Sequence, residues 1–103
     1  MSGSNGPPRR FRINATPAIV QKVQQLHPEA TQTGRGAAFA FAMRRLRRDL
    51  QTRPRDCGEP LRLYKNAQLE LRAASERPAI IWFGVHQIQF EVVVIEVELM
   101  PVH

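Results

Sequence analysis

The sequence has a single cysteine, Cys57, and only two lysines among its fifteen basic residues. One cysteine cannot close an intramolecular disulfide, which favours a reducing compartment. No apolar run reaches the roughly 20 residues that a membrane helix needs. The opening residues MSGSNGPPRR also lack the apolar core of a secretory signal. The sequence therefore predicts a cytoplasmic protein without a membrane partner.

The motifs of nucleotide and metal chemistry are absent as well. The chain contains no GxxxxGK[ST], GxGxxG, HExxH or CxxC. Its three histidines, His27, His86 and His103, have no cysteine or carboxylate at the spacing that metal ligands need. We therefore expect no metal site and no small-molecule cofactor.

The whole chain has a formal charge of +6 and a pI near 11.0, and its positive charge is concentrated in the first part. Residues 1–62 hold twelve basic and four acidic side chains, a balance of +8. Residues 63–103 hold three basic and five acidic ones, a balance of −2. Because guanidinium groups bind phosphates and carboxylates with paired hydrogen bonds, the sequence predicts a polyanion or an acidic protein as partner. A GC-rich genome, which favours arginine codons, explains the same bias.

Composition and periodicity divide the chain into a tail and one domain. Residues 1–10 predict a flexible tail, and residues 11–103 predict a single domain. Residues 11–15 alternate apolar and polar side chains, as a short half-buried strand does. Thr16–Pro17 predicts the start of a helix, and Pro28 predicts that this helix ends or kinks.

A second helix is predicted over residues 37–52. Four apolar side chains fall on one narrow stripe of this helix: Phe39, Met43, Leu46 and Leu50. Arg44 and Arg48 point the opposite way, and Arg47 lies beside the stripe. The pattern predicts a helix hairpin that shares one apolar face.

The apolar period changes from 3.6 to 2 after residue 60. Leu69, Leu71 and Ala73 alternate with polar residues, and residues 79–85 form an apolar run of strand length. Trp82 lies in this run and is interpreted as a core residue rather than a base-stacking one. In the following strand, the doubled apolar pattern at Val92–Ile95 predicts burial of both faces or a β-bulge. This strand should therefore be an inner strand of the sheet.

The order of elements is a strand, two helices, and then several strands joined by tight turns. Helices that precede a run of sequential hairpins predict an α+β domain. We expect an N-terminal strand and a two-helix hairpin packed on a largely antiparallel sheet of about four strands.

This order resembles that of the RelE/ParE superfamily of bacterial toxins over roughly residues 11–99. The resemblance is carried by loose motifs: Leu46…Leu50…Pro54…Gly58-Glu-Pro60-Leu61, Leu69-Glu-Leu71-Arg72, and the strands at 79–85 and 92–99. RelE-like members cut messenger RNA on the ribosome without metal, using basic side chains on the exposed sheet face. The resemblance therefore implies Arg72 and Lys65 as catalytic residues.

His86 is added as a candidate general acid or base, although a solvated histidine in a turn is the simpler interpretation. Elsewhere the sequence departs from the nuclease pattern. Glu96 and Glu98 share one face of the final strand, where they would repel a phosphate. This departure weakens the nuclease interpretation.

Two functions therefore remain open. The first is the toxin of a toxin–antitoxin pair, which inhibits translation by ribosome-dependent messenger cleavage and has an antitoxin and RNA or the ribosome as partners. The alternative is a non-catalytic RelE/ParE-like module that binds nucleic acid or an acidic protein, including a ParE-like binding of DNA gyrase. Five arginines are candidates for such binding: Arg62, Arg77, Arg44, Arg47 and Arg48. For the last three, an ordinary solvated helix face is the simpler alternative.

Overall fold

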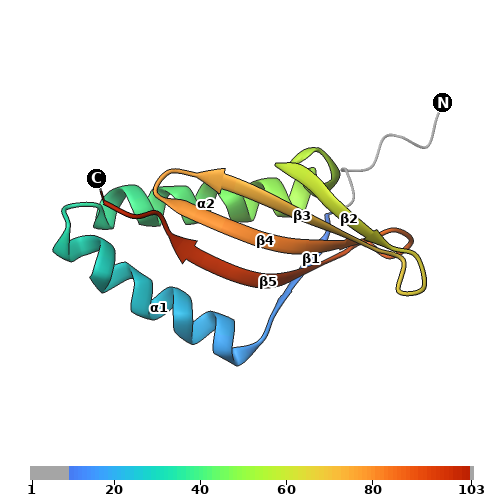
Figure 1. Cartoon of the computed structure of the whole chain (residues 1–103), viewed down its shortest axis with the longest axis horizontal. Helices are drawn as coiled ribbons and strands as arrows, with labels where there is room; N and C mark the ends of the chain where they lie inside the picture. Colours follow the sequence, from blue (N-terminus) through green and yellow to red (C-terminus); the bar gives the residue numbers. More distant parts are fainter. Residues whose placement is uncertain (1–9, 103) are drawn as a thin grey trace.

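The computed structural model describes residues 10–102, so that the predicted tail, apart from Arg10, lies outside the described residues. Two helices pack on one face of a single sheet (Figure 1). The elements follow one another as β1 (Arg12–Ala15), α1 (Pro17–Gln32), α2 (Gly36–Thr52), the 3-10 turn η2 (Pro54–Asp56), β2 (Glu59–Tyr64), β3 (Leu69–Glu76), β4 (Ala79–His86) and β5 (Glu91–Leu99).

The sheet has the strand order β1-β5-β4-β3-β2. All neighbouring strands are antiparallel except β1, which runs parallel to β5. The α+β prediction, with a helix pair packed on the sheet, is confirmed. The sheet is mixed and has five strands rather than about four, because residues 59–64 and 69–76 form two separate strands joined by a turn.

The first helix begins where the sequence predicts and ends later. Thr16 caps α1, since its side-chain oxygen accepts a hydrogen bond from the backbone N–H of Ile19 at 3.3 Å. Of the two outcomes predicted at Pro28, an end of the helix is wrong, because α1 continues through this proline to Gln32. Ala30, in the turn after the proline, is fully buried. We infer that packing of this last turn outweighs the one helical hydrogen bond that proline removes.

The stripe of α2 forms the helix side of the core, as predicted. Phe39, Leu46 and Leu50 are buried, while Met43 packs against the core from its edge. They meet the sheet residues that point toward the helices, among them Phe83. In Figure 1, α2 lies behind the sheet, and α1 runs along the β5 side.

The final strand lies inside the sheet and contains a bulge. Phe83 pairs with Val94 while its neighbour Trp82 pairs with Glu96, so Ile95 is an extra residue in β5. The bulge, one of the two predicted alternatives, is thus confirmed. Because β1 pairs with β5 on its other side, the prediction of an inner strand is also confirmed.

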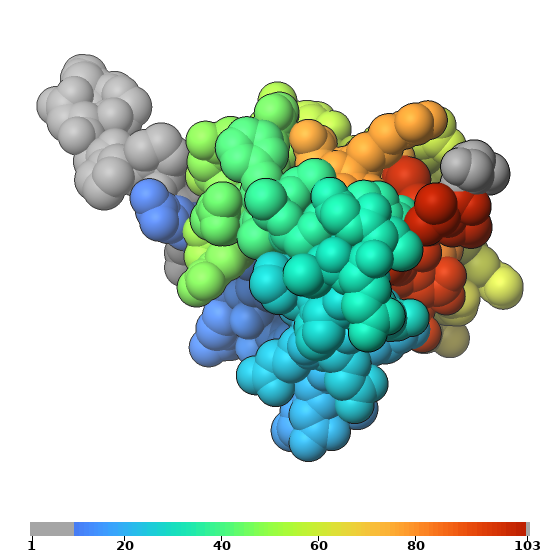
Figure 2. All heavy atoms as spheres, turned by 90° about the vertical axis from the view of Figure 1, so that its left-hand side faces the viewer, coloured from blue at the N-terminus to red at the C-terminus, as the bar shows by residue number. Residues whose placement is uncertain are grey.

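The end of β5 lies beside the turn between the helices. Arg35, in this turn, donates a hydrogen bond to the carbonyl oxygen of Met100 at 2.6 Å. Figure 2 shows the red residues after β5 next to the helix turn. Neither of the described helices has the length and apolar character needed to cross a membrane.

Candidate binding surfaces

Arg72 points toward the helices, into the interior. It pairs across the strands with Phe83, which is fully buried, and cross-strand partners share one face of a sheet. The Arg72 Nε donates to the carbonyl oxygen of Cys57 at 3.0 Å, and Nη2 donates to that of Gly58 at 3.1 Å. Nη1 contacts the Glu70 carboxylate at 2.6 Å. Arg72 therefore holds the loop before β2 onto the sheet.

This orientation separates Arg72 from the other candidate catalytic residues. The resemblance implies an arginine on the exposed face, yet Arg72 is 7% exposed. His86 pairs with Leu69 and so lies on the opposite face of the sheet. Lys65 is exposed in the turn between β2 and β3. A catalytic role for these three side chains stays a prediction, and the structure does not bring them together.

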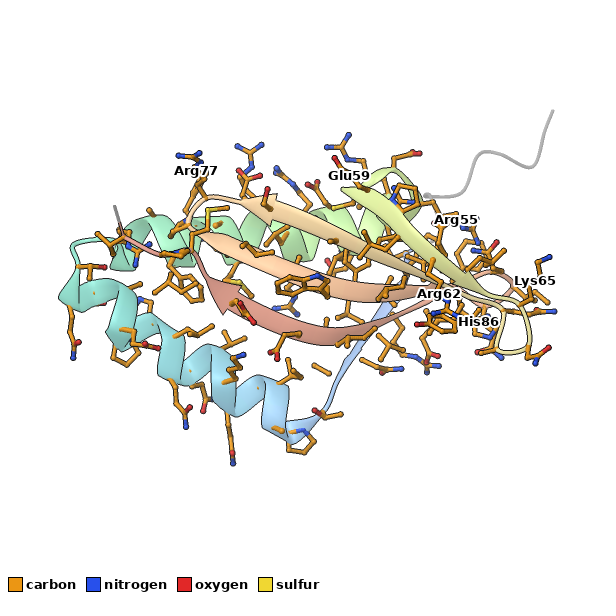
Figure 3. The ribbon with its side chains drawn as sticks, in the orientation of Figure 1. Arg55, Glu59, Arg62, Lys65, Arg77 and His86 are labelled. Atoms are coloured by element: carbon orange, nitrogen blue, oxygen red, sulfur yellow. The ribbon has the colours of Figure 1, made fainter. Side chains whose placement is uncertain are left out.

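Lys65, His86 and Arg62 gather instead at one end of the sheet (Figure 3). The turn after β2 and the turn after β4 meet there, where the Gln87 backbone N–H donates to the Gln68 carbonyl oxygen at 2.7 Å. Arg62 lies over the ring of its neighbour Tyr64, with the guanidinium carbon 4.9 Å from the ring centroid.

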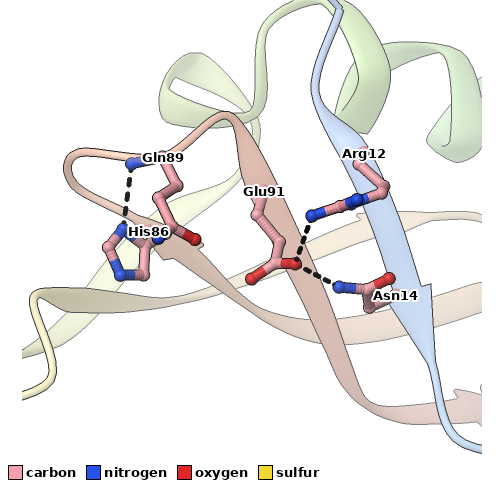
Figure 4. Close-up of polar contacts among 5 residues, drawn as sticks. All are labelled: Arg12, Asn14, His86, Gln89 and Glu91. Carbon is pink, nitrogen blue, oxygen red and sulfur yellow. Dashed lines mark hydrogen bonds and ion pairs between the residues drawn. The ribbon is translucent and has the colours of Figure 1, made fainter.

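His86 shapes the turn that follows it. Its Nδ1 accepts a hydrogen bond from the backbone N–H of Ile88 at 3.2 Å. It also accepts one from the backbone N–H of Gln89 at 3.0 Å, which Figure 4 shows. With Nδ1 accepting, the proton of the neutral imidazole lies on Nε2. The residue thus has a structural part in the β4–β5 turn.

Arg77 lies at the opposite end of the molecule, in the turn between β3 and β4 (Figure 3). It is exposed. The basic residues of the sheet half therefore do not form one continuous patch.

Arg55 is a residue that the sequence did not single out. Its guanidinium carbon lies 5.3 Å from the ring centroid of Phe11 and 6.0 Å from that of Phe90. It also donates a hydrogen bond to the carbonyl oxygen of Gln87 at 3.2 Å. These contacts join segments far apart in the chain, so they cannot be predicted from the spacing of neighbouring residues.

The start of β1 carries a further charged contact, at the end of the sheet where His86 lies (Figure 4). Arg12 lies 3.4 Å from the Glu91 carboxylate, which also accepts a hydrogen bond from the side chain of Asn14. This carboxylate thus has a cation and an amide beside it, which reduces the negative charge that it presents to a partner.

One face of the sheet is not covered by either helix, and we call it the open face. Its apolar part consists of residues that alternate with the buried ones: Leu69, Leu71, Ala73, Ile80, Trp82, Val93 and the bulged Ile95. The interpretation of Trp82 as a core residue is wrong, because Trp82 is half-buried on this face. Its neighbours Ile81 and Phe83 point the other way, into the core.

Glu96 and Glu98 also lie on the open face, as the sequence predicts, but their surroundings differ. The Lys22 ammonium of α1 reaches the Glu96 carboxylate at 2.6 Å. This hydrogen bond, together with one from the backbone N–H of Val97, lowers the pKa of Glu96. Glu98 is exposed and forms no ion pair with any described residue.

A groove of about 590 Å³ lies between the helices on the covered side of the sheet. Its floor is made of the buried Ile81, Val94 and Val97. Its walls are aliphatic: Ile13 and Ala15 of β1, Ile19, Val20 and Val23 of α1, and Met43, Leu46 and Leu50 of α2. Three polar side chains complete the lining: Gln24, Arg44 and Arg47. Both the volume and the apolar lining are typical of binding sites.

The arginines of α2 differ in their partners. Arg45 lies 3.4 Å from the Glu76 carboxylate, and Arg53, just after the helix, lies 3.5 Å from that of Asp49. Three others are exposed and have no ion pair with a described residue: Arg44, Arg47 and Arg48. The charges of Arg44 and Arg47, which line the groove, are therefore available to a partner there.

Cys57 is a buried thiol in the loop that Arg72 holds. Burial raises the pKa of this thiol, with a further contribution from the negative charge of Asp49. A neutral, buried thiol is a poor nucleophile, so Cys57 has a packing role.

Comparison of the chain with models of protein families, with curated proteins and with solved structures yields no match. The resemblance to the RelE/ParE superfamily therefore stays a prediction.

Proposed function

We propose that this protein is a non-catalytic binding module of RelE/ParE-like architecture, which docks an acidic amphipathic helix of a protein partner between α1 and α2. A partner of the antitoxin kind fits this description. The observation that carries the proposal is the groove itself, whose aliphatic walls are bordered by Arg44 and Arg47, two cations without an ion pair among the described residues.

The chemistry of the groove selects the occupant. A segment lying between apolar walls has to satisfy its own backbone N–H and C=O groups, which a helix does internally. Its apolar stripe would cover groove residues such as Val20, which is 46% exposed. Because Val20 is already about half buried, covering the rest of it stabilises a complex by about half of the ~1.5–3 kcal/mol that full burial of such a side chain gives. Carboxylates on the flank of the helix would meet Arg44 and Arg47, which sets its orientation and speeds association.

Ribonuclease activity has less support from the geometry. Arg72 donates to Cys57, Gly58 and Glu70 and is buried, so its guanidinium is not offered to a phosphate. His86 lies on the other face of the sheet. Binding of a partner does not require Arg72 and His86 to lie close together, whereas catalysis by both would.

The proposal is tested with a designed peptide of about four helical turns, with leucines at positions i, i+3, i+4 and i+7 and glutamates on its flank. We expect it to bind the protein and to gain helix on binding, as measured by fluorescence anisotropy and circular dichroism. The double variant Arg44→Glu/Arg47→Glu should lose most of this affinity, and the loss should shrink at high salt. Val20→Asp should weaken binding by removing part of the apolar wall.

The matched control is Lys65→Glu/Arg77→Glu. It changes the net charge by the same amount as Arg44→Glu/Arg47→Glu, but at the two ends of the sheet, and it should leave binding intact. A peptide of the same composition with its leucines scrambled should not bind. Equal binding by both double variants, or equal binding of the scrambled peptide, would refute the groove as the docking site. If a neighbouring gene encodes a small protein with an acidic amphipathic helix, that helix is the natural second probe.

A further inference from the structure

The open face has an apolar centre and two corners of opposite charge. Trp82 lies near the centre, surrounded by apolar side chains of the adjacent strands: Leu71, Ala73, Val93 and Ile95. Arg62 lies at the β2 corner and Glu98 at the β5 corner. Neither of these two charged groups forms an ion pair with a described residue. An apolar surface with unpaired charges at its rim is typical of a contact surface.

The strand register places the two charged corners on a diagonal. Arg62 pairs with Leu71 and lies level with Gly84, whereas Glu98 lies level with Ile80. They are thus three strands apart, or about 14 Å, and four residues apart along the strands, or about 13 Å. The midpoint of this diagonal falls beside Trp82.

We infer that the open face is the contact surface between two copies of this chain. A two-fold axis in the plane of contact, perpendicular to the diagonal, brings the Arg62 of each copy onto the Glu98 of the other. The same axis superposes the two apolar centres, so that both Trp82 rings become buried. The strands of the two sheets then cross near a right angle, which is one of the two ways in which sheets pack. Such a self-complementary interface closes as a dimer.

A nucleic acid is a poorer occupant of this face. Glu98 has no neutralising partner among the described residues, and it lies on the same face as Glu96, so a phosphate backbone would meet repulsion there. In a second copy, by contrast, the unpaired Arg62 supplies the missing counter-charge. The dimer also leaves the groove between α1 and α2 free, because the groove lies on the opposite side of the sheet.

The test is the oligomeric state in solution, measured by sedimentation equilibrium over a range of concentrations. We expect a reversible dimer that Ile95→Lys converts to a monomer, since this bulged side chain is 46% exposed and lies outside the core. Arg62→Glu and Glu98→Arg should each raise the dissociation constant by about tenfold or more. The combined variant Arg62→Glu/Glu98→Arg should restore dimerisation toward the original value, because both contacts are re-formed with their charges exchanged.

Two further measurements complete the test. Trp82 is the only tryptophan in the chain, and its fluorescence should move to shorter wavelength as the dimer forms. Arg77→Glu, the same charge change at the far turn, should leave the dissociation constant unchanged. A chain that is monomeric at every concentration, a dimer unaffected by Ile95→Lys, or a combined variant weaker than both single variants would each overturn the inference. None of these results bears on peptide binding in the groove, so this inference and the proposed function fail separately.

Discussion

Arg72 determines how the chain passes from the helices to the sheet. Its guanidinium donates to the carbonyl oxygens of two consecutive residues, Cys57 and Gly58, while Glu70 balances its charge. A buried arginine with all these contacts fixes the loop that connects η2 to β2. Arg72, one of the three catalytic candidates, therefore has a structural explanation that is complete without a substrate.

Replacing Arg72 by methionine should destabilise the fold. The substitution leaves two carbonyl groups without their donor and the Glu70 carboxylate without its counter-charge. Each buried polar group left unsatisfied costs about 1–3 kcal/mol, so we expect the free energy of unfolding to fall by about 3 kcal/mol. Chemical denaturation measures this change. Arg77→Met, at an exposed turn, should alter stability by no more than about 0.5 kcal/mol. Equal stability of the two variants would mean that the loop does not depend on Arg72.

The contact between Lys22 and Glu96 should make stability depend on pH. Because the pKa of Glu96 is lowered in the folded chain, its contribution is complete above the ordinary glutamate pKa. The contribution is then lost as the pH falls through the lower, folded-state pKa. The difference in unfolding free energy between the original chain and Glu96→Gln should therefore shrink in acid. The same difference, measured in a Lys22→Met background, should lose most of its dependence on pH, because the hydrogen bond from Lys22 is then absent.

At the scale of secondary-structure elements, the spacing of residues predicted those features that depend on interactions between near neighbours in the chain. The stripe of α2 and the cap at Thr16 both follow from residues within a few positions of one another. The orientation of β3 could not be predicted in this way. Leu71 and Ala73 are apolar and would suit a buried face, yet they lie on the open face. What turns Arg72 inward is a pair of carbonyl oxygens that lie 14 and 15 positions earlier in the chain.

The candidate sites divide in the same way. Arg44 and Arg47 were recognisable as exposed cations from the helical period alone. The groove beside them was not, because its width depends on how α1 packs against β5 and diverges from α2. Such a distance between elements is set by long-range packing and leaves no trace in the spacing of residues within either helix.

Two glycines at element boundaries allow a matched test of loop geometry. Gly34, between the helices, and Gly58, before β2, both have positive φ angles, of 73° and 70°. A Cβ added at Gly34 meets nothing within 4 Å, whereas one at Gly58 overlaps the carbonyl group of Ala73. Gly34→Ala should therefore cost only the backbone strain of about 1–2 kcal/mol.

Gly58→Ala should add the steric overlap to the same strain, for an extra loss of about 1–3 kcal/mol. Thermal and chemical denaturation of both variants would give the difference. If the two alanine variants were equally stable, the loop before β2 would have to move away from Ala73 more easily than its close contacts indicate.

At the scale of the whole molecule, the sheet divides two surfaces from each other. The groove lies on the helix side and the proposed dimer contact on the open side. A dimer joined through the open face would carry two grooves on its outer surfaces, and a partner with two linked helices could engage both. Such bivalent binding strengthens association without any new contact, provided that the linker spans both sites.

A binding module of this kind should not cleave messenger RNA. When the gene is induced in a bacterial host, we expect messages to remain intact on the ribosome, as followed by primer extension. The physical reason is that Arg72 is committed to the interior and His86 to its turn. Ribosome-dependent cleavage that His86→Ala abolishes, with the variant shown to be folded, would contradict this expectation and establish the protein as a nuclease.

The parallel pairing of β1 with β5 has a consequence for synthesis. Arg12 and Glu91 are 79 residues apart, yet they are neighbours in the sheet. A ribosome delivers β1 first and β5 last of the elements described, so the sheet cannot be completed before β5 has been made. Until β5 has been made, β1 has no strand to pair with, and the apolar side chains of the helices and β4 that pack against β5 remain exposed to water. We expect folding to begin late and to finish as one event. A chain that stops before β5 should therefore be a substrate for chaperones and proteases rather than a partly working module.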